Sequence, residues 1–423
     1  MNDPVREQQY IPYLVAVNLT ERCNLNCAHC YMDAQQRKSA RENELGQNEL
    51  SVLFAEIARH APGTIIVLTG GEPLMHPEIE RIVISGVEVG LRMVLGTNGV
   101  LLTEPAIKKF KKIGLSGVGI SLDSIYEDQH DSFRGVSGSF TRSCNAVRLC
   151  KSNGLHVQLH FTVTSSNYRQ LKKVVGLGSQ LGASIINFFF LVCVGRGKSY
   201  LDIPPDLYEK SLKEIAELQE SSKGIMIQSR CTPHFKRILY ENNPDSPYTR
   251  ATGYDGGGCP AATHYCRITP TGEVTPCPYI ELSAGSIRER SFWEIWQNAQ
   301  LFKSFRNPEL LEGRCGRCEF KLLCGGCRAR SLVQSGSLMA EDPNCSYIPR
   351  GREVIAVQSN FTDSRVEWTP EAKERLKKIP IFLRGLIKKR LEERARTEGT
   401  AVTVALMKKH KEEREKELGI KFR

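Results

Sequence analysis

Long apolar runs are missing from this 423-residue chain, and their absence argues against a membrane protein. The longest such run, Ile185 to Val194, is about half of the ~20 residues that a membrane-spanning helix needs. The first ten residues are polar and charged and contain no apolar signal-peptide core. No internal repeat at a fixed period is present. We therefore expect a globular protein of the cytoplasm.

The chain also lacks an even distribution of excess basic residues, although its net charge is +11. Between Trp368 and Arg423 there are 17 Lys and Arg against 9 Glu, which gives +8 of that charge. The preceding residues are nearly balanced, which argues against nucleic acid as a partner. Cysteine, in contrast, is abundant, with 15 residues. Without a signal peptide, so many cysteines indicate metal ligands in a reducing compartment.

Short β-rich runs alternate with amphipathic helical stretches from about Tyr13 to Val194. The runs are YLVAVNL, TIIVLTG, RMVLGTN, GVGISLD, VQLHFTVT and IINFFFLV. This alternation predicts parallel β/α units. Because six strands are too few for the eight-stranded barrel, we expect an α/β fold with a partial (β/α)6 barrel. Its site would lie on the loops at the carboxyl ends of the strands.

Four segments are expected along the chain. The barrel occupies residues 11–205, and a helical bridge follows at 206–254, where PPDLYEKSLKEIAELQE predicts a helix with Pro at its start. A cysteine-rich domain occupies residues 255–349. A basic helical tail occupies residues 366–423.

The first motif follows the first strand, where Cys23, Cys27 and Cys30 are spaced C-x3-C-x2-C. Three thiolates in one short loop can hold one face of a four-iron cluster and leave the fourth iron without a protein ligand. The alternative, a structural zinc ion, needs four ligands. The motif resembles the signature of the radical S-adenosylmethionine (SAM) superfamily, in which an aromatic residue adjoins the last cysteine, as Tyr31 does here. The resemblance implies a [4Fe-4S] cluster whose open iron binds SAM and cleaves it to a 5'-deoxyadenosyl radical.

Further motifs follow at successive strand ends, and the same resemblance assigns them to SAM. The turn GGEP would serve the methionine amino group, and the polar residues after the next two strands would serve its carboxylate and the ribose hydroxyls. The residues so assigned are Gly70, Gly71, Glu72, Asn98, Ser121 and Asp123. Each position, taken alone, also fits a strand-end turn or a helix cap.

The stretch HDSFRGVSGSF, with His130, Arg134 and Gly135, matches one common in the subgroup that carries C-terminal cluster domains. Arg134 would either pair with a carboxylate of cofactor or substrate or lie on the surface. His160, on an apolar strand, is more often a satisfied core residue than a catalytic one and stays unassigned. No catalytic residue is named.

A second block of eight cysteines resembles the SPASM domain of peptide- and cofactor-maturing radical enzymes. The resemblance implies two four-iron clusters in addition to the first, three in all. The inner one would be held by Cys259, Cys266, Cys277 and Cys327, and the outer one by Cys315, Cys318, Cys324 and Cys345. Only two residues separate Cys324 from Cys327, where the family usually has three, so the role of Cys327 is in doubt. Two zinc ribbons would use the same eight residues.

Four cysteines remain outside these motifs. Cys144 and Cys150 lie six apart in one predicted helix and do not share a face well, while Cys193 and Cys231 stand alone. We expect all four to be small buried hydrophobic residues.

The tail resembles the small C-terminal domain of the B subunit of light-independent protochlorophyllide reductase, which helps to enclose a tetrapyrrole. The resemblance rests on Trp368, the run Ile379 to Arg384 and the stretch Glu392 to Gly399. Basic residues would attract a carboxylate-rich ring, and Trp368 and Phe382 would supply an apolar wall. The basic residues are Lys377, Lys378, Arg384, Lys388 and Lys389. A solvated helix pair used for oligomerisation is the alternative.

Together these motifs favour radical modification of a tetrapyrrole side chain, as in the heme-biosynthesis members of the family. An electron donor such as ferredoxin or flavodoxin would reduce the first cluster. A peptide maturase is the rival enzyme, but only about a dozen residues precede the first strand, and such maturases usually carry a leader-binding domain there. An electron-transfer scaffold is a third hypothesis, against which the SAM motifs argue.

Overall fold

The computed structural model describes residues 10–34, 43–250 and 258–355, and in the tail residues 366–377, 379, 387–388, 390–392, 394–395, 398 and 400–418. The chain divides into two compact units, Met1–Val357 and Gln358–Arg423. Among the described residues, no helix has both the length and the apolar character needed to cross a bilayer.

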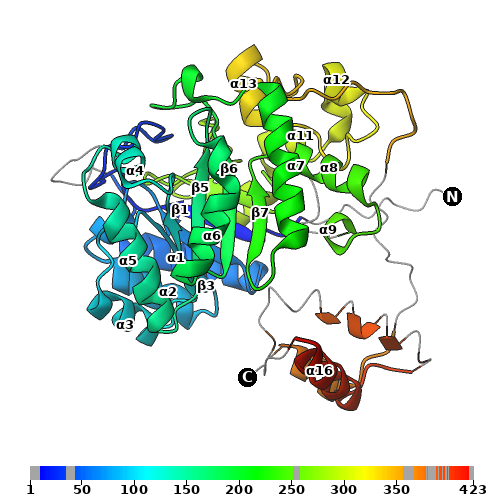
Figure 1. Cartoon of the computed structure of the whole chain (residues 1–423). Helices are drawn as coiled ribbons and strands as arrows, with labels where there is room; N and C mark the ends of the chain where they lie inside the picture. Colours follow the sequence, from blue (N-terminus) through cyan, green and yellow to red (C-terminus); the bar gives the residue numbers. More distant parts are fainter. Residues whose placement is uncertain are drawn as a thin grey trace. The chain divides into compact units, whose positions relative to one another are not determined.

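One sheet organises the first unit (Figure 1), and its order is β10-β9-β8-β1-β2-β3-β4-β5-β6-β7. The strands are β1 (Leu14–Asn18), β2 (Ile65–Thr69), β3 (Arg92–Thr97), β4 (Gly117–Ser121), β5 (Val157–Val163), β6 (Ile185–Phe190), β7 (Met226–Arg230), β8 (Tyr265–Ile268), β9 (Glu273–Thr275) and β10 (Gly285–Ser286). Strands β8 and β1 to β7 pair in parallel, while β9 pairs antiparallel with both β8 and β10. The sheet ends at β10 and β7, so the barrel is open.

The six predicted strands are confirmed as β1 to β6. The sheet nevertheless continues on both sides with strands from segments expected outside the barrel. Strand β7 comes from the predicted helical bridge, and β8 comes from the cysteine-rich segment and pairs with β1, where Cys266 lies opposite Val15. The cysteine-rich segment is therefore joined to the barrel through backbone hydrogen bonds.

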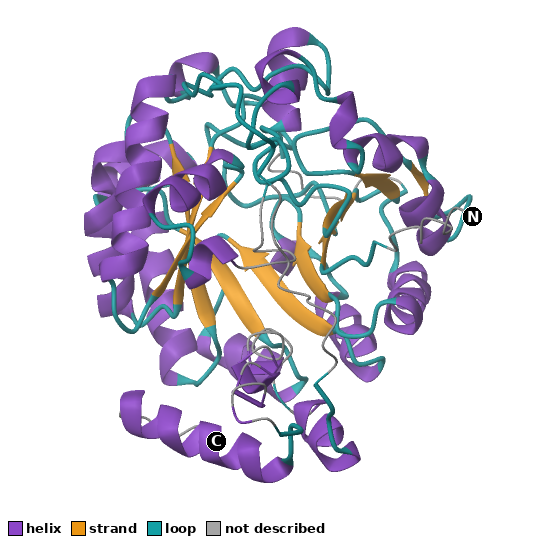
Figure 2. Cartoon of the chain, turned by 90° about the vertical axis from the view of Figure 1, so that its right-hand side faces the viewer, coloured by secondary structure: helices purple, strands orange, loops and turns teal. Residues whose placement is uncertain are grey.

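Along the chain, helices alternate with the strands, and in space they lie along one side of the sheet (Figure 2). The helices of the first unit are α1 (Gln47–His60), α2 (Ile79–Glu88), α3 (Glu104–Lys112), α4 (Glu127–Arg134), α5 (Ser139–Ser152), α6 (Leu171–Leu181), α7 (Pro205–Ser221), α8 (His234–Asn242), α9 (Pro247–Arg250), α10 (Phe292–Asn298), α11 (Gln300–Phe305), α12 (Gly313–Gly316) and α13 (Arg328–Ser335), with short 3-10 turns at Pro73–Met75, Tyr168–Gln170, Ser199–Leu201 and Pro308–Leu310. The predicted helix in the bridge is α7. It begins at Pro205, which fits the first turn because its missing N–H has no partner there.

The two faces of the sheet differ in polarity. In β5, Leu159 and Phe161 are fully buried in the main apolar core, while Gln158, His160 and Thr162 alternate with them and are partly exposed. Side chains two apart on a strand share a face. The core therefore lies on the helix-covered face, and the inner face of the open barrel is free to carry polar chemistry.

The tail unit has a small core of its own, in which α14 (Pro370–Lys377) and α16 (Val404–Leu418) take part. Trp368 packs against this core, and its indole N–H donates to Glu392 at 2.9 Å. The Trp368 ring, which was predicted to form an apolar wall for the substrate, therefore packs at least partly against the tail's own core. Lys378, Phe382, Arg384 and Lys389 lie outside the described residues.

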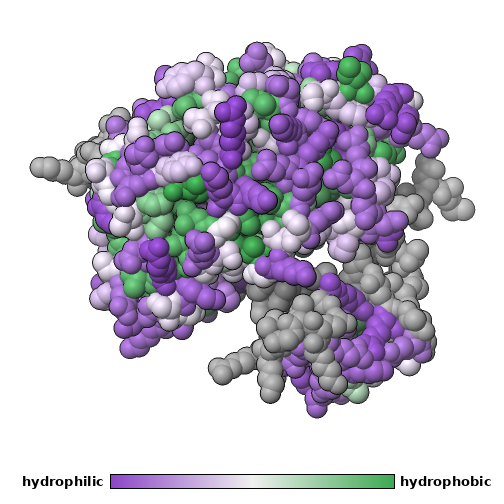
Figure 3. Space-filling view, viewed as in Figure 1, coloured by the Kyte–Doolittle hydropathy of each residue, from purple (hydrophilic) through white to green (hydrophobic). Residues whose placement is uncertain are grey.

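The face of the first unit seen in Figure 3 is mostly hydrophilic, with apolar side chains interspersed among charged ones. Scattered apolar residues of this kind are normal on protein surfaces.

Candidate active site and cluster-binding cysteines

The three cysteines of the first motif converge in the loop that follows β1. Cys23 and Cys27 are buried, and Cys30 is partly exposed and packs in the same small cluster. Burial raises the pKa of Cys23 to about 12, and the charges of Cys27 and Cys30 act in the same direction. Buried thiols of this kind ionise only when a strong cation is close, as iron is in a cluster. The donor set therefore fits one face of an iron-sulfur cluster.

The segment that ends helix α4 holds this loop in place. The backbone N–H groups of Asn26 and Ala28 donate to the carbonyls of Arg134 and Phe133 at 3.0 and 2.9 Å. Gly135 has a φ of 71°, and a Cβ there would lie 2.7 Å from the Asn26 carbonyl oxygen. Only glycine tolerates both the left-handed backbone and this approach.

A buried ion pair lies behind the loop. Arg134 pairs with Asp123, and its Nη1 lies 3.6 Å from the Cys27 sulfur. The other Asp123 oxygen accepts the Thr162 N–H at 2.9 Å. Burial alone would raise the pKa of Asp123, but the Arg134 cation and nearby histidines hold it below its ordinary value. The surface alternative for Arg134 is therefore wrong, and its carboxylate partner belongs to the protein.

Glu72 of the GGEP turn is fully buried and serves the protein with both oxygens. Oε1 accepts the Thr97 hydroxyl at 2.7 Å, and Oε2 accepts the Asn98 N–H at 2.9 Å. Burial raises the pKa of Glu72 above its ordinary value, although these hydrogen bonds act to lower it. The carboxylate thus joins the ends of β2 and β3.

The two glycines of the turn allow it to lie against the chain that enters the cysteine loop. A Cβ on Gly71 would lie 2.2 Å from the Arg22 carbonyl oxygen, and one on Gly70 would lie 2.6 Å from that of Thr20. The Gly71 N–H donates to the Thr20 carbonyl and the Glu72 N–H to the Arg22 carbonyl, both at 2.8 Å. The turn and the cysteine loop are therefore fixed relative to each other.

The remaining predicted contacts to SAM come from neighbouring strand ends. The Asn98 side chain donates to Asn24 inside the cysteine loop at 2.7 Å. Ser121 ends β4 and is partly exposed. The Tyr31 hydroxyl accepts from Asn18 at 3.3 Å, and its ring meets that of Tyr279 edge-on at 5.7 Å.

His160 lies on the inner face of the barrel and outside the apolar core. A Cβ on Gly119 would meet its ring at 2.3 Å, and the ring lies 5.2 Å from that of Phe189. Burial lowers the pKa of His160 to about 4, and the nearby Arg230 cation acts in the same direction. At neutral pH the imidazole is uncharged.

Arg196, which no sequence motif marked, also holds the cysteine loop. It follows β6, and its side chain donates to the carbonyls of Cys27 and Ala34 at 3.0 and 2.8 Å and to the Asp33 carboxylate at 2.8 Å. The adjoining Gly195, in the run GRG, was the only available sign of a close backbone approach.

The four cysteines predicted for the outer cluster are brought together. All four line one hollow beside α12, with His234, Arg237, Asp342 and Tyr347 also on its wall. The four cysteines are Cys315, Cys318, Cys324 and Cys345. Their number and chemistry fit a four-iron cluster.

The four cysteines predicted for the inner cluster are not brought together. Cys259, Cys277 and Cys327 lie close enough for their charges to interact, and burial with these charges raises the pKa of Cys277 well above its ordinary value. Cys266, in β8, is fully buried in the main apolar core. Burial raises its pKa too, but the charge that acts on it belongs to Arg306.

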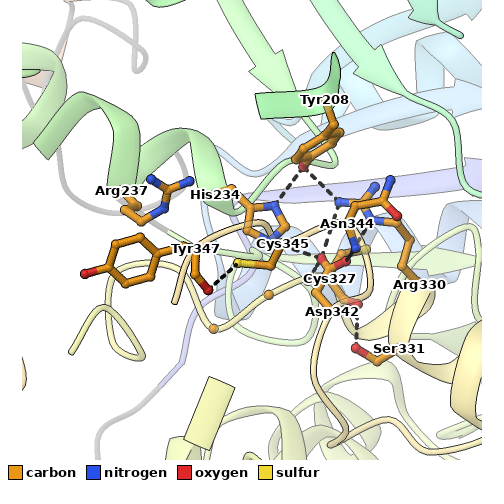
Figure 4. Close-up of polar contacts among 12 residues, drawn as sticks. Tyr208, His234, Arg237, Cys327, Arg330, Ser331, Asp342, Asn344, Cys345 and Tyr347 are labelled. Carbon is orange, nitrogen blue, oxygen red and sulfur yellow. Dashed lines mark hydrogen bonds and ion pairs between the residues drawn. The ribbon is translucent and has the colours of Figure 1, made fainter. Parts of the chain in front are cut away.

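A buried polar network connects the two cysteine groups (Figure 4). Asp342 accepts the Cys327 N–H at 2.6 Å, pairs with Arg330 at 3.2 Å and lies 3.5 Å from His234. Tyr208 hydrogen-bonds with both His234 and Arg330, at 2.9 and 3.0 Å. Burial would raise the pKa of Asp342, but the Arg330 cation and the other partners lower it to about 2. The carboxylate stays ionised between the two groups.

Within the part of the chain that the structure describes, no three His, Cys, Asp or Glu side chains have an arrangement that could hold one metal ion. Thiolates around a four-iron cluster lie farther apart than those around zinc, because iron and sulfide lie between them.

Known families match three parts of the chain. The model described as the radical SAM superfamily matches residues 17–177, and that of an iron-sulfur cluster-binding domain matches residues 259–319. A third, described as the proto-chlorophyllide reductase 57 kD subunit, matches residues 368–411.

Relatives and solved structures agree with these matches. The AdoMet-dependent heme synthase of Methanosarcina barkeri is 37% identical over 80% of this chain and 97% of its own length. The Fe-coproporphyrin III synthase of the same organism is 31% identical over 78% of this chain and 87% of its own. In fold, the chain resembles Streptococcus suis SuiB bound to S-adenosylmethionine, with a TM-score of 0.66, 16% identity and coverage of 80% and 78%.

The open β/α barrel, the cysteine loop after β1 and the family matches place this chain in a class of enzymes. Enzymes of this class hold an iron-sulfur cluster at the end of such a barrel. Within that class the chain belongs to the radical SAM superfamily. It is an enzyme that uses SAM and [4Fe-4S] clusters.

Proposed function

We propose that this enzyme decarboxylates, removes or oxidises a side chain of an anionic tetrapyrrole. The observation that carries the proposal is the 37% identity to a heme synthase over 97% of that relative's length. The second relative is named for an iron coproporphyrin. Both named products are carboxylate-bearing iron tetrapyrroles, so the shared chemistry is that of the ring's acidic side chains.

Cys23, Cys27 and Cys30 would hold the first cluster, which when bound supplies the electron that cleaves SAM to the 5'-deoxyadenosyl radical. The protein's own part is to fix the loop and to balance charge beside it. Arg134 places a cation 3.6 Å from the Cys27 sulfur, and Asp123 keeps that cation in position. The pair would stabilise the anionic thiolates without an exposed surface charge.

SAM would lie along the ends of β1 to β4. We assign Tyr31, the GGEP backbone, Asn98 and Ser121 to its contacts. Because both oxygens of Glu72 bind protein groups, Glu72 would act by positioning Asn98. Asp123, whose two oxygens bind Arg134 and the Thr162 N–H, would likewise order the site from within the protein. The assigned residues are Tyr31, Gly70, Gly71, Glu72, Asn98, Ser121 and Asp123.

The substrate would enter the inner face of the barrel, where an apolar ring and polar groups occur together. The rings of Phe189 and the uncharged His160 lie there at 5.2 Å with a tilted geometry, and Arg230 on β7 is in register with Phe189. A cation at this depth would attract a propionate or acetate group. Arg230 also donates to Asn187 at 3.2 Å, which holds its side chain on that face.

We further propose three clusters per chain, with the two auxiliary ones accepting the electron left after hydrogen abstraction, and a ferredoxin or flavodoxin as reductant. The buried network around Asp342 supports an electronic connection between the auxiliary clusters, because it links Cys327 to the wall of the outer hollow. The segments 11–205, 206–254, 255–349 and 366–423 would be barrel, bridge, cluster domain and substrate-enclosing tail.

The test is a titration of the anaerobically reconstituted enzyme with iron coproporphyrin III, followed by the Soret band. We expect a shift at micromolar concentration. Deletion of residues 366–423 should weaken this binding and leave SAM cleavage by the reduced enzyme intact, because the deleted unit has its own core. If no tetrapyrrole binds, the substrate proposal fails in favour of a peptide. If the shortened chain binds equally well, the role of the tail fails.

A further inference from the structure

Cys266 faces away from the other auxiliary cysteines. It pairs in register with Val15 on the neighbouring strand, and both side chains are fully buried in the main apolar core. Ile268, two residues later in β8, belongs to the same core. Directly opposed residues on paired strands point to the same face. To reach the cluster on the other side, the Cys266 thiol would have to cross the sheet.

Cys231 lies where Cys266 was expected. It directly follows β7, and its φ of 59° places it in the left-handed region, which is uncommon for a residue with a Cβ. This backbone turn is tied to α13, because Arg330 donates to the Cys231 carbonyl at 3.0 Å. Helix α13 begins immediately after Cys327, so the two cysteines are fixed to one another.

The Cys231 thiol also lies within electrostatic range of the three inner cysteines. Its charge acts on both Cys259 and Cys277, and that of Cys327 acts on Cys231. The side chain shares a hydrogen bond with Tyr279, which packs with Cys277 and Cys327. The expectation that Cys231 is an isolated hydrophobic residue is therefore wrong.

We propose that Cys231, and not Cys266, completes the inner auxiliary cluster together with Cys259, Cys277 and Cys327. This inference rests on the proposed function in one respect, because it assumes that the inner cysteines hold a four-iron cluster. With four thiolates the inner cluster has no open iron. It would then carry electrons and would not bind the substrate directly, and the strained backbone at Cys231 would be retained because it aims the thiol.

The experiment uses the full chain with Cys23, Cys27 and Cys30 replaced by Ala, so that only auxiliary clusters contribute. This background should hold about 8 iron after anaerobic reconstitution. Adding Cys231→Ala should lower the iron content and give, on mild oxidation, the EPR signal of a three-iron cluster. Cys266→Val, which fills the same apolar site, is the matched control and should keep about 8 iron and the background spectrum.

The outcomes separate the two hypotheses. If Cys231→Ala keeps its iron and spectrum, whether or not Cys266→Val loses them, the ligand assignment is overturned while the cluster count stands. If the background holds only about 4 iron, and Cys318→Ala removes all of it, no inner cluster exists and the three-cluster proposal fails with the assignment. Cys231→Ser, a weaker oxygen ligand, should give an intermediate iron content if the thiolate is a ligand.

Discussion

Replacing Asp123 by Asn would remove one half of the buried pair behind the cysteine loop and leave Arg134 without its counter-charge. The Asp123 side chain is fully buried and that of Arg134 is 8% exposed, so water cannot replace the lost partner. Breaking a buried ion pair from one side costs about 3–5 kcal/mol of unfolding free energy. Asn keeps the shape and one acceptor for the Thr162 N–H, so we expect the lower end of that range.

Urea unfolding of the cluster-free protein under reducing, anaerobic conditions, followed by circular dichroism, measures this cost. Asp128→Asn, at an exposed position of the adjoining α4, is the control and should change stability by less than about 0.5 kcal/mol. If Asp123→Asn were within about 1 kcal/mol of the control, the pair would not support the loop as argued.

The pH dependence gives a second measurement of the same pair. The pKa of Asp123 is lowered in the folded protein, so its contribution is present above the unfolded-state value of about 4 and is lost as the pH falls through the folded value. Wild type should therefore lose more stability than Asp123→Asn when the pH is lowered below about 4. An equal loss in both proteins would contradict the shifted pKa.

The remaining predictions concern clusters and substrate. Wild type should hold about 12 iron, and the variant with Cys23, Cys27 and Cys30 replaced by Ala should hold about 8. After dithionite reduction this variant should form no 5'-deoxyadenosine. SAM cleavage by the variant would show that the open iron is elsewhere. Arg196→Gln removes three hydrogen bonds from the cysteine loop, so visible absorbance of the first cluster should bleach faster in air than in Arg148→Gln, an exposed control on α5; equal rates would refute the role of Arg196. Arg230→Gln should weaken iron coproporphyrin III binding about tenfold and flatten its salt dependence while SAM cleavage continues; unchanged affinity would remove Arg230 from the substrate site.

Strands β1 to β6, and the loops after them, were predictable from the sequence because each apolar run is short and ends in a polar turn. The convergence of Cys23, Cys27 and Cys30 followed from spacing within one loop. The side chains that hold these loops in place were not predictable, because they reach the loops from distant parts of the sequence, across the barrel. Arg196 lies 163 residues from Asp33 in the chain, and no local pattern announces their ion pair.

The inner cysteines show where spacing misleads. A family pattern counts residues but does not say which face of a strand each one occupies. In the run YCRI, Cys266 and Ile268 are two apart and share a face, and this periodicity was a sign that Cys266 belongs to the core. Cys231 lacks any such sign, since its place beside Cys327 depends on how β7 and α13 meet.

The proposed function requires that this enzyme abstract a hydrogen atom from a tetrapyrrole side chain. The most direct measurement uses iron coproporphyrin III carrying deuterium on its side-chain methylene carbons, incubated with SAM and the reduced, reconstituted enzyme. Mass spectrometry should find deuterium in 5'-deoxyadenosine and a matching change in the mass of the porphyrin. Formation of 5'-deoxyadenosine without deuterium, with the porphyrin unchanged, would contradict the claim.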